Sequence, residues 1–189
     1  MLRPLALSAL LLLSPTLFAS DQERLRQADF PAQRALEQTR LELKNQAVLN
    51  YLWLDVYAAA LYTEPRLRPA QATASQSSKR LELYYFRDIE RDDLIEAAWV
   101  TLRRQHAAAT LERLRPGLDA LHSNFRDIRP GDRYALNYSP RAGLSLEHNG
   151  VTVFTSDDAE LASAYLGIWL APNGLSEQLR DTLLANPGQ

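Results

Sequence analysis

The chain has 189 residues and a formal net charge of −2, with three histidines and no cysteine. This slight negative charge gives no electrostatic reason to expect nucleic acid or an anionic lipid surface as a partner. Without cysteine the chain can form no disulfide and has no thiol nucleophile. Its stability must therefore come from packing alone.

The N-terminus, "MLRPLALSALLLLSPTLFAS", has the layout of a secretory signal peptide: Arg3, then a leucine-rich apolar run, then the small residues Ala19 and Ser20. The apolar run is well short of the roughly 20 residues that cross a bilayer. We therefore expect residues 1–20 to be a signal peptide, cleaved after Ala19 or Ser20. Residues 21–189 are expected to form a single periplasmic domain with no integral membrane segment.

The rest of the chain divides into segments with the period of strands or of helices. A polar stretch over 21–40, interrupted by Pro31, predicts a loosely attached lead-in. The expected elements that follow are strands at 40–46, 49–62 and 79–88, a polar connector with room for one helical turn at 69–78, helices at 91–106 and 110–125, strands at 129–140, 142–150 and 151–156, and helices at 157–170 and 175–185.

Short local signals support several of these boundaries. Asn149 and Gly150 form the dipeptide most typical of a β-hairpin, and Ser176 is placed to cap the last helix. The pair Pro116–Gly117 predicts a kink or a division in the second helix. Strands come first, then helices, then a meander, then helices again. This order predicts an α+β domain in which helices pack on an antiparallel sheet.

The segment "LNYLWLDVYAAALY", residues 49–62, is apolar on both faces of the expected strand or bent pair of strands. Alternation places Tyr51, Trp53 and Tyr57 on one face and small or aliphatic residues on the other. Since both faces require cover, we expect a cleft floor or a second helical layer on the aromatic face. A plain two-sided core, a bulge or break near Asp55, and a helix over "VYAAALY" are the alternatives.

Motifs for metal, phosphate or nucleophilic chemistry are missing from the sequence, and we expect no metal and no cofactor. The histidines His106, His122 and His148 have no metal-binding spacing. His106 falls on an apolar helical stripe with Trp99, where it is either a site residue or a helix-end residue with a backbone partner.

The segments "DVYAAALY", "GDRYALNY", "HNG" and "LASAYLGIWLAPNGLSEQLRDTLL" resemble the bacterial, secreted branch of the chalcone isomerase-like family, from about Phe30 to the end. The resemblance implies an open-faced β-sandwich, in which a large antiparallel sheet carries a layer of helices on one face. Members of this family either close a flavanone ring or bind fatty acids without turnover. The bacterial members are similar to the non-enzymatic ones.

The resemblance also implies where a ligand site would lie. The arginine that clamps the ligand in the family corresponds to Leu49, and a threonine corresponds to Tyr57. A tyrosine and an asparagine correspond to Trp99 and His106, and a hydroxyl residue corresponds to Ile168. Isomerisation needs a cation and hydrogen-bond donors near the developing oxyanion. With Leu49 and Ile168 at two of these positions, we expect no catalytic residues.

The sequence therefore predicts a non-catalytic periplasmic protein that binds a small apolar or amphipathic, fatty-acid-like molecule. One alternative is an isomerase of the chalcone type, an intramolecular lyase, that uses Tyr57 and His106 as acid–base groups. Another is an envelope protein-interaction module. The expected ligand-binding residues are Leu49, Tyr51, Trp53, Tyr57, Trp99, His106 and Ile168.

Overall fold

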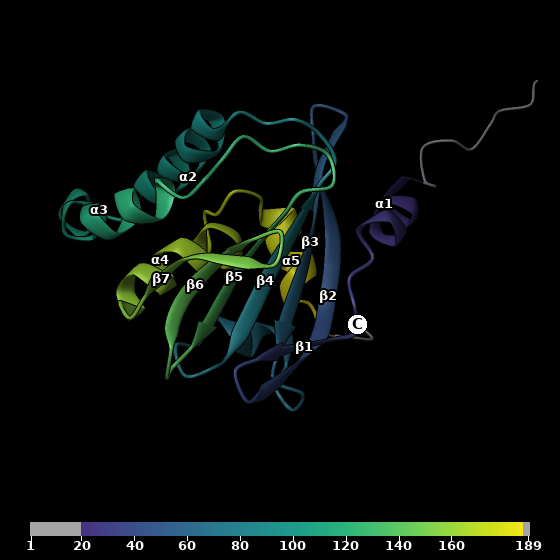
Figure 1. Cartoon of the computed structure of the whole chain (residues 1–189), viewed down its shortest axis with the longest axis horizontal. Coiled ribbons are helices and arrows are strands. Elements are labelled where there is room, and N and C mark those ends of the chain that lie inside the picture. Colours follow the sequence, from purple (N-terminus) through teal and green to yellow (C-terminus); the bar gives the residue numbers. More distant parts are fainter. Residues whose placement is uncertain (1–19, 187–189) are drawn as a thin grey trace, which may run out of the picture.

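The computed structural model describes residues 20–186, so the signal-peptide prediction lies almost entirely outside the described residues. Within this range, seven strands form one antiparallel sheet in which each strand pairs with its neighbour in the sequence (Figure 1). The strands are β1 (Gln33–Leu36), β2 (Thr39–Tyr51), β3 (Leu54–Thr63), β4 (Lys79–Tyr85), β5 (Arg133–Ser139), β6 (Gly143–His148) and β7 (Val151–Ser156).

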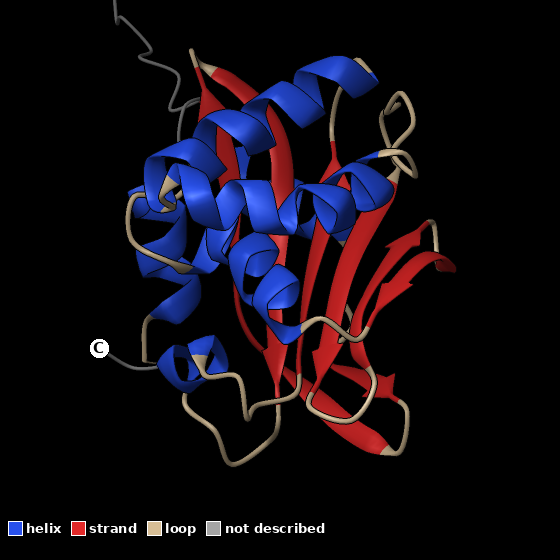
Figure 2. Ribbon diagram, turned by 90° about the vertical axis from the view of Figure 1, so that its left-hand side faces the viewer, coloured by secondary structure: helices blue, strands red, loops and turns tan. Residues whose placement is uncertain are grey.

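Helices cover both faces of this sheet. Figure 2 shows the main helical layer against one face. It consists of α2 (Arg91–Gln105), α3 (Ala108–His122), α4 (Ala159–Leu170) and α5 (Glu177–Leu184), with the short 3₁₀-helix η1 (Pro69–Thr73) beside it. A further helix, α1 (Ser20–Ala28), packs against β2 and β3. None of the helices in residues 20–186 combines the length and the apolar character that crossing a bilayer would require.

This architecture confirms the predicted α+β fold, and most local signals agree with it. Asn149 and Gly150 adopt positive φ values of 51° and 80° in the β6–β7 hairpin, as a tight hairpin turn requires. The Ser176 side chain accepts a hydrogen bond from the backbone of Leu179 at the start of α5. Of the two alternatives predicted at Pro116, a kink or a division, the division is wrong, because α3 continues through this residue.

Of the two forms predicted for residues 49–62, a long strand or a bent pair of strands, the single long strand is wrong. The chain reverses at Leu52 and Trp53, whose φ values are 47° and 68°, and β2 and β3 pair on either side of this turn. Tyr51 and Trp53 lie at the tip of the hairpin and are 67% and 95% exposed. The prediction that they share a face with Tyr57 is therefore wrong, because the turn interrupts the alternation.

Both faces of β3 are nevertheless buried, as the sequence predicted. Tyr57 belongs to the core on the side of α2 to α5, with Ala59 and Leu61. Ala58 and Ala60 belong to a second core, to which Leu25 of α1 and Ala28 at its end contribute. The layer of α2 to α5 thus covers the face of Tyr57, where a cleft floor or a second helical layer was predicted, and α1 covers the opposite face. The predicted loose lead-in is wrong, because Ala28 is fully buried and the chain continues into β1.

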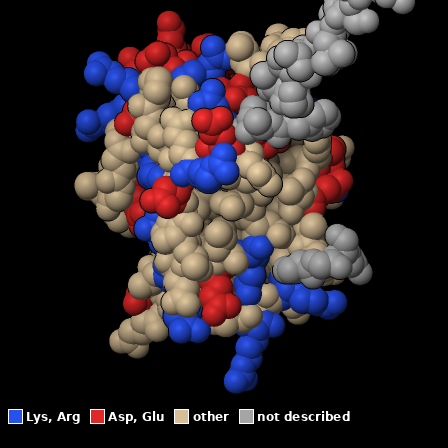
Figure 3. Space-filling view, turned by 90° about the vertical axis from the view of Figure 1, so that its right-hand side faces the viewer, with Lys and Arg blue, Asp and Glu red and all other residues tan. Residues whose placement is uncertain are grey.

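Beside this second core, the outer face of the sheet holds a buried ionic cluster centred on Glu82. Its carboxylate, 1% exposed, accepts hydrogen bonds from Arg34 at 2.8 Å, Arg80 at 3.0 Å and Arg133 at 2.8 Å. Burial alone would raise the pKa of Glu82, but the guanidinium groups of Arg80 and Arg34 outweigh it and hold that pKa below its ordinary value. On the side of the molecule that carries α1, basic and acidic side chains are intermixed (Figure 3).

Replacing the central carboxylate, Glu82→Gln, should destabilise the protein by about 3 kcal/mol, because it leaves buried guanidinium groups without a counterion. Urea denaturation at pH 7 measures this loss. The same substitution at an exposed glutamate, Glu90→Gln, should change stability by less than about 0.5 kcal/mol. Equal effects of the two substitutions would contradict the central role of Glu82.

The turn at Leu52 and Trp53 should be improved by the double substitution Leu52→Asn/Trp53→Gly. A left-handed conformation costs a residue other than glycine roughly 1–2 kcal/mol, whereas Asn-Gly adopts this turn readily. We expect the midpoint of urea denaturation to rise, corresponding to about 1–2 kcal/mol. Substituting Val151→Ser, which removes a similarly exposed apolar side chain from a residue without a positive φ, should not raise it.

Candidate functional site

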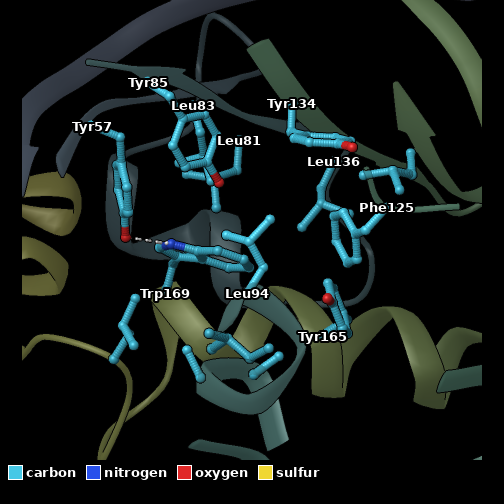
Figure 4. A pocket seen from close by; sticks show the side chains of 15 residues that line it. Tyr57, Leu81, Leu83, Tyr85, Leu94, Phe125, Tyr134, Leu136, Tyr165 and Trp169 are labelled. Atoms are coloured by element: carbon cyan, nitrogen blue, oxygen red, sulfur yellow. Dashed lines mark hydrogen bonds between the residues drawn. The ribbon is translucent and has the colours of Figure 1, made fainter. Parts of the chain in front are cut away.

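An apolar cavity of about 70 Å³ lies between the sheet and the helices α2 and α4 (Figure 4). Strands β3 to β6 form one wall, and the other comes from α2, α4 and the residues that follow α3 and α4. All fifteen lining residues are uncharged. The aromatic ones are Tyr57, Tyr85, Phe125, Tyr134, Tyr165 and Trp169.

The tyrosines surround the cavity with their rings in edge contact. The ring of Tyr85 lies 5.4 Å from that of Tyr57 and 6.4 Å from that of Tyr134, between ring centres. The Trp169 indole donates a hydrogen bond to the hydroxyl of Tyr57 at 2.9 Å (Figure 4). The hydroxyl of Tyr134 accepts one from the backbone of Arg126. These contacts join β3, β4, β5 and α4 around one space.

The phenols in this cavity stay neutral across the ordinary pH range. Burial raises the pKa of Tyr57 well above its usual value, and the hydrogen bond from Trp169 only partly offsets this. Burial likewise raises the pKa of Tyr85 and Tyr165, and the neighbouring phenols add to it. Such groups can donate hydrogen bonds to a ligand, but they cannot supply a phenolate base.

A positively charged side chain at this cavity would favour catalysis, but none of the residues that line it is charged. Leu49 is half-buried on β2 and packs against the helix-side core. It lines a separate groove with Ser176 and Leu179, at the start of α5. Arg104, on α2, donates instead to the carbonyls of Asn173 and Gly174. The cavity therefore has no positive charge to offset a developing oxyanion.

The structure brings only two of the expected site residues to the cavity, namely Tyr57 and Ile168. Trp99 lies against His122 on α3, with 5.7 Å between ring centres. His106 ends α2, where its backbone N–H donates to Leu102. Leu49 lines the separate groove at α5, and Tyr51 and Trp53 project at the tip of the β2–β3 hairpin.

The orientation of α2 accounts for part of this difference. Leu94, Ala97 and Ala98 line the cavity. The apolar stripe predicted from the sequence consisted of Ile95, Ala98, Trp99 and Leu102, and of these only Ala98 reaches the cavity. The helix is turned so that Trp99 meets α3 instead of the sheet. Two apolar stripes were present in the sequence, and only the packing of α2 against α3 and α4 selects between them.

Sequence reasoning missed Tyr85, Tyr165 and Trp169, although signals for them were present. Tyr85 continues the alternation of Leu81 and Leu83 along β4, which places it on the helix side. Tyr165 and Trp169 are four residues apart and so share one face of α4. These signals mark a buried face, but they do not reveal that three buried faces meet around a cavity.

His122 is the histidine that the structure singles out, although the sequence pointed to His106. Its side chain is 3% exposed, and neither ring nitrogen has a hydrogen-bond partner in the described part of the chain. It contacts Trp99, Phe125 and Tyr165, so it lies behind the last two as seen from the cavity. Burial lowers the pKa of His122 to about 4. Within residues 20–186, no His, Asp and Glu side chains cluster in a way that could hold a metal ion.

The sequence profile of the chalcone isomerase-like family matches residues 22–185. This protein therefore belongs to the chalcone isomerase-like family. Among solved structures, it is similar to a fatty-acid binding protein of Arabidopsis thaliana, with a TM-score of 0.59 and 15% sequence identity over 82% of this chain and 90% of the plant chain. At this identity the likeness shows a shared fold. A search of curated proteins found no significant match.

Acid should destabilise this protein through His122. Above pH 6.5 the imidazole is neutral in the folded and unfolded states alike. Between pH 6.5 and about 4 only the unfolded state takes up the proton, so stability falls as the pH falls, by up to about 1.4 kcal/mol per pH unit. Urea denaturation at pH 7, 6 and 5 should show a shallower fall for His122→Phe. The variant His106→Gln serves as the control, and curves for His122→Phe that run parallel to the wild type would contradict this assignment.

Proposed function

We propose that this protein is a periplasmic, non-catalytic member of the chalcone isomerase-like family that binds a small apolar or amphipathic molecule. The ligand would be fatty-acid-like and would occupy the cavity beneath α2. One observation carries the proposal: the cavity is lined by aromatic and aliphatic side chains with neutral phenols and no charge. The periplasmic location rests on the signal-like sequence of residues 1–20.

The chemistry of the lining favours an apolar ligand that has a polar group. Binding would remove apolar surface from water on both partners, and the phenols of Tyr57, Tyr85 and Tyr165 would orient a carbonyl or hydroxyl oxygen. The fold is shared with a plant protein that binds fatty acids. That protein's ligand is consistent with this lining, since an acyl chain suits an aromatic, uncharged wall.

The ligand must enlarge the cavity, because about 70 Å³ accommodates only a few water molecules and ligand pockets commonly measure about 300 Å³ or more. The wall formed by α2 is suited to move. This helix makes its main contacts with α3 and α4 and few with the sheet. Ala97 on its cavity side is already exposed. Outward displacement of α2 would join the cavity to solvent without breaking the sheet.

The same lining argues against ring closure by this protein. An isomerase would need a cation and donors aimed at the enone oxygen, and losing one such donor commonly costs about 100-fold in rate. None of the residues that line the cavity carries a charge, and His106 is not among them. We therefore expect no conversion of a chalcone to a flavanone at a rate above the uncatalysed one.

A second candidate function, an envelope protein-interaction module, is favoured by the exposed apolar tip of the β2–β3 hairpin. Four consecutive residues there, Tyr51 to Leu54, are between 49% and 95% exposed. If a partner binds the tip, Leu52→Asn/Trp53→Gly should abolish its recovery from a periplasmic extract. Recovery that is unchanged in this variant would exclude the tip as the contact.

Binding in the cavity can be tested with Ala98→Leu, which adds three carbons from α2 to the cavity wall. Methyl palmitate, 1-decanol and a flavanone, none of which carries a carboxylate, should each be tried in a thermal-shift titration. A ligand at about 100 times its Kd stabilises the folded state by about 2.7 kcal/mol, which raises the Tm by several degrees. We expect this rise for the wild type and its loss in Ala98→Leu.

The matched control for this experiment is Ala109→Leu, the same substitution at an exposed position of α3. It should respond to ligand as the wild type does. A wild-type protein whose Tm is raised by none of the three compounds would overturn the proposed function. Turnover of a chalcone that disappears in His106→Ala would instead establish the isomerase alternative.

A further inference from the structure

A second cavity, of about 80 Å³, lies at the other end of the sheet–helix interface. It is enclosed by η1, the first residue of β4, the end of β5 and one side of α4. Lys79 and Tyr138 line it, and Leu81 and Leu136, two residues further along the same strand faces, line the first cavity. The two cavities are therefore neighbours within one layer.

Lys79 is a buried cation without a counterion. Lys79 is 4% exposed. No carboxylate in the described part of the chain lies within ion-pair distance of its ammonium group. The other buried charged residues, Arg80 and Glu82, are paired with each other and with further groups. Buried charges are normally paired in this way, since desolvation without compensation is costly.

The ammonium group has hydrogen-bonding capacity to spare. Its nitrogen donates to the carbonyl of Ala74 at 2.7 Å and lies 4.9 Å from the ring centre of Tyr138. An ammonium group has three N–H donors, and the described residues accept from one of them. Burial lowers the pKa of Lys79 to about 8, so the group is still mostly charged at pH 7.

The remaining wall of the second cavity suits a short aliphatic chain, although at about 80 Å³ this cavity too must widen to hold one. Ala162, Leu166 and Leu170 of α4 provide an apolar side, and each is buried. Ser75 and Ser163 are exposed and line the same cavity, so they mark where it opens to solvent. The second cavity thus combines exposed hydroxyl groups, an apolar wall and an unpaired ammonium group.

We propose that this second cavity is a binding site for an aliphatic monocarboxylate, whose carboxylate pairs with Lys79 and whose chain lies against Leu166 and Leu170. The bound carboxylate is the counterion that Lys79 lacks within the protein, and it accepts hydrogen bonds from the free N–H groups of the ammonium. This site is separate from the aromatic cavity and does not depend on the function proposed for it.

The energetics of an unpaired lysine give a second, independent signature. A residue retained for binding in spite of its desolvation cost should lower the stability of the ligand-free protein. Replacing it with methionine, which keeps the aliphatic stem and removes the charge, should therefore raise the denaturation midpoint and weaken carboxylate binding at the same time. If Lys79 served only to donate a hydrogen bond to the carbonyl of Ala74, its replacement by methionine would instead lower the denaturation midpoint and leave carboxylate binding unchanged.

The chain is well suited to a direct test, because Lys44 and Lys79 are its only lysines. Protein labelled with ¹³C at lysine Cε should give one signal for each, and hexanoate is the probe, with 1-hexanol as the neutral comparison. We expect hexanoate to move the Lys79 signal and to raise its pKa above about 8, while the Lys44 signal stays in place. Affinity should fall as the pH rises through that value. Tyr138 is the only other titratable residue that lines this cavity.

Calorimetry on variants completes the test. Lys79→Met should weaken hexanoate binding at least tenfold, Lys79→Arg should retain part of it, and Lys44→Met should bind as the wild type does. Ala98→Leu, which alters only the aromatic cavity, should also bind hexanoate normally, and this separates the two proposals.

Two results would overturn the carboxylate site: hexanol that binds as tightly as hexanoate, or a Lys79 signal that hexanoate leaves unchanged. Both are measured on the wild type and do not require that any variant folds.

Discussion

The burial of β3 on both of its faces is the constraint on which the rest of this structure depends. Alternate residues of one short run, Ala58 to Tyr62, contact either α1 or the layer of α2 to α5, and all are fully buried. Small side chains at Ala58, Ala59 and Ala60 let helical layers approach from two sides. The sheet can then carry a closed apolar layer on one face while α1 covers β2 and β3 on the other.

Strand alternation also separates charge from the aromatic cavity. Along β4, Leu81, Leu83 and Tyr85 face the helices, whereas Arg80 and Glu82 face outward into the ionic cluster. A shift of one residue would exchange the two sets, because the period of a strand is two. The cavity is uncharged for this reason: the buried arginines of the sheet belong to its opposite face. Lys79 is the exception, since it lies on the helix side without a counterion.

Most of the secondary structure and part of the candidate site could be predicted from the sequence. The β6–β7 turn was predictable because Asn-Gly has a strong intrinsic preference for it. The turn at Leu52 and Trp53 was not, since neither residue favours a positive φ and the run around them is uniformly apolar. Because this turn was not predicted, Tyr51 and Trp53 were assigned to the same face as Tyr57. The predicted cleft floor therefore included two residues that are exposed at the hairpin tip.

The sequence by itself determined the kind of most elements from residue 40 onward, the α+β class and the membership of the family, because these follow from local periodicity and from the order of recognisable segments. Only the tertiary structure decided which side chains surround an empty space. Tyr57, Tyr85 and Trp169 come from β3, β4 and α4, and their meeting depends on strand register and on how each helix is turned about its axis. Local alternation gives each residue a buried side, whereas a cavity is the part of that buried space that packing leaves unfilled.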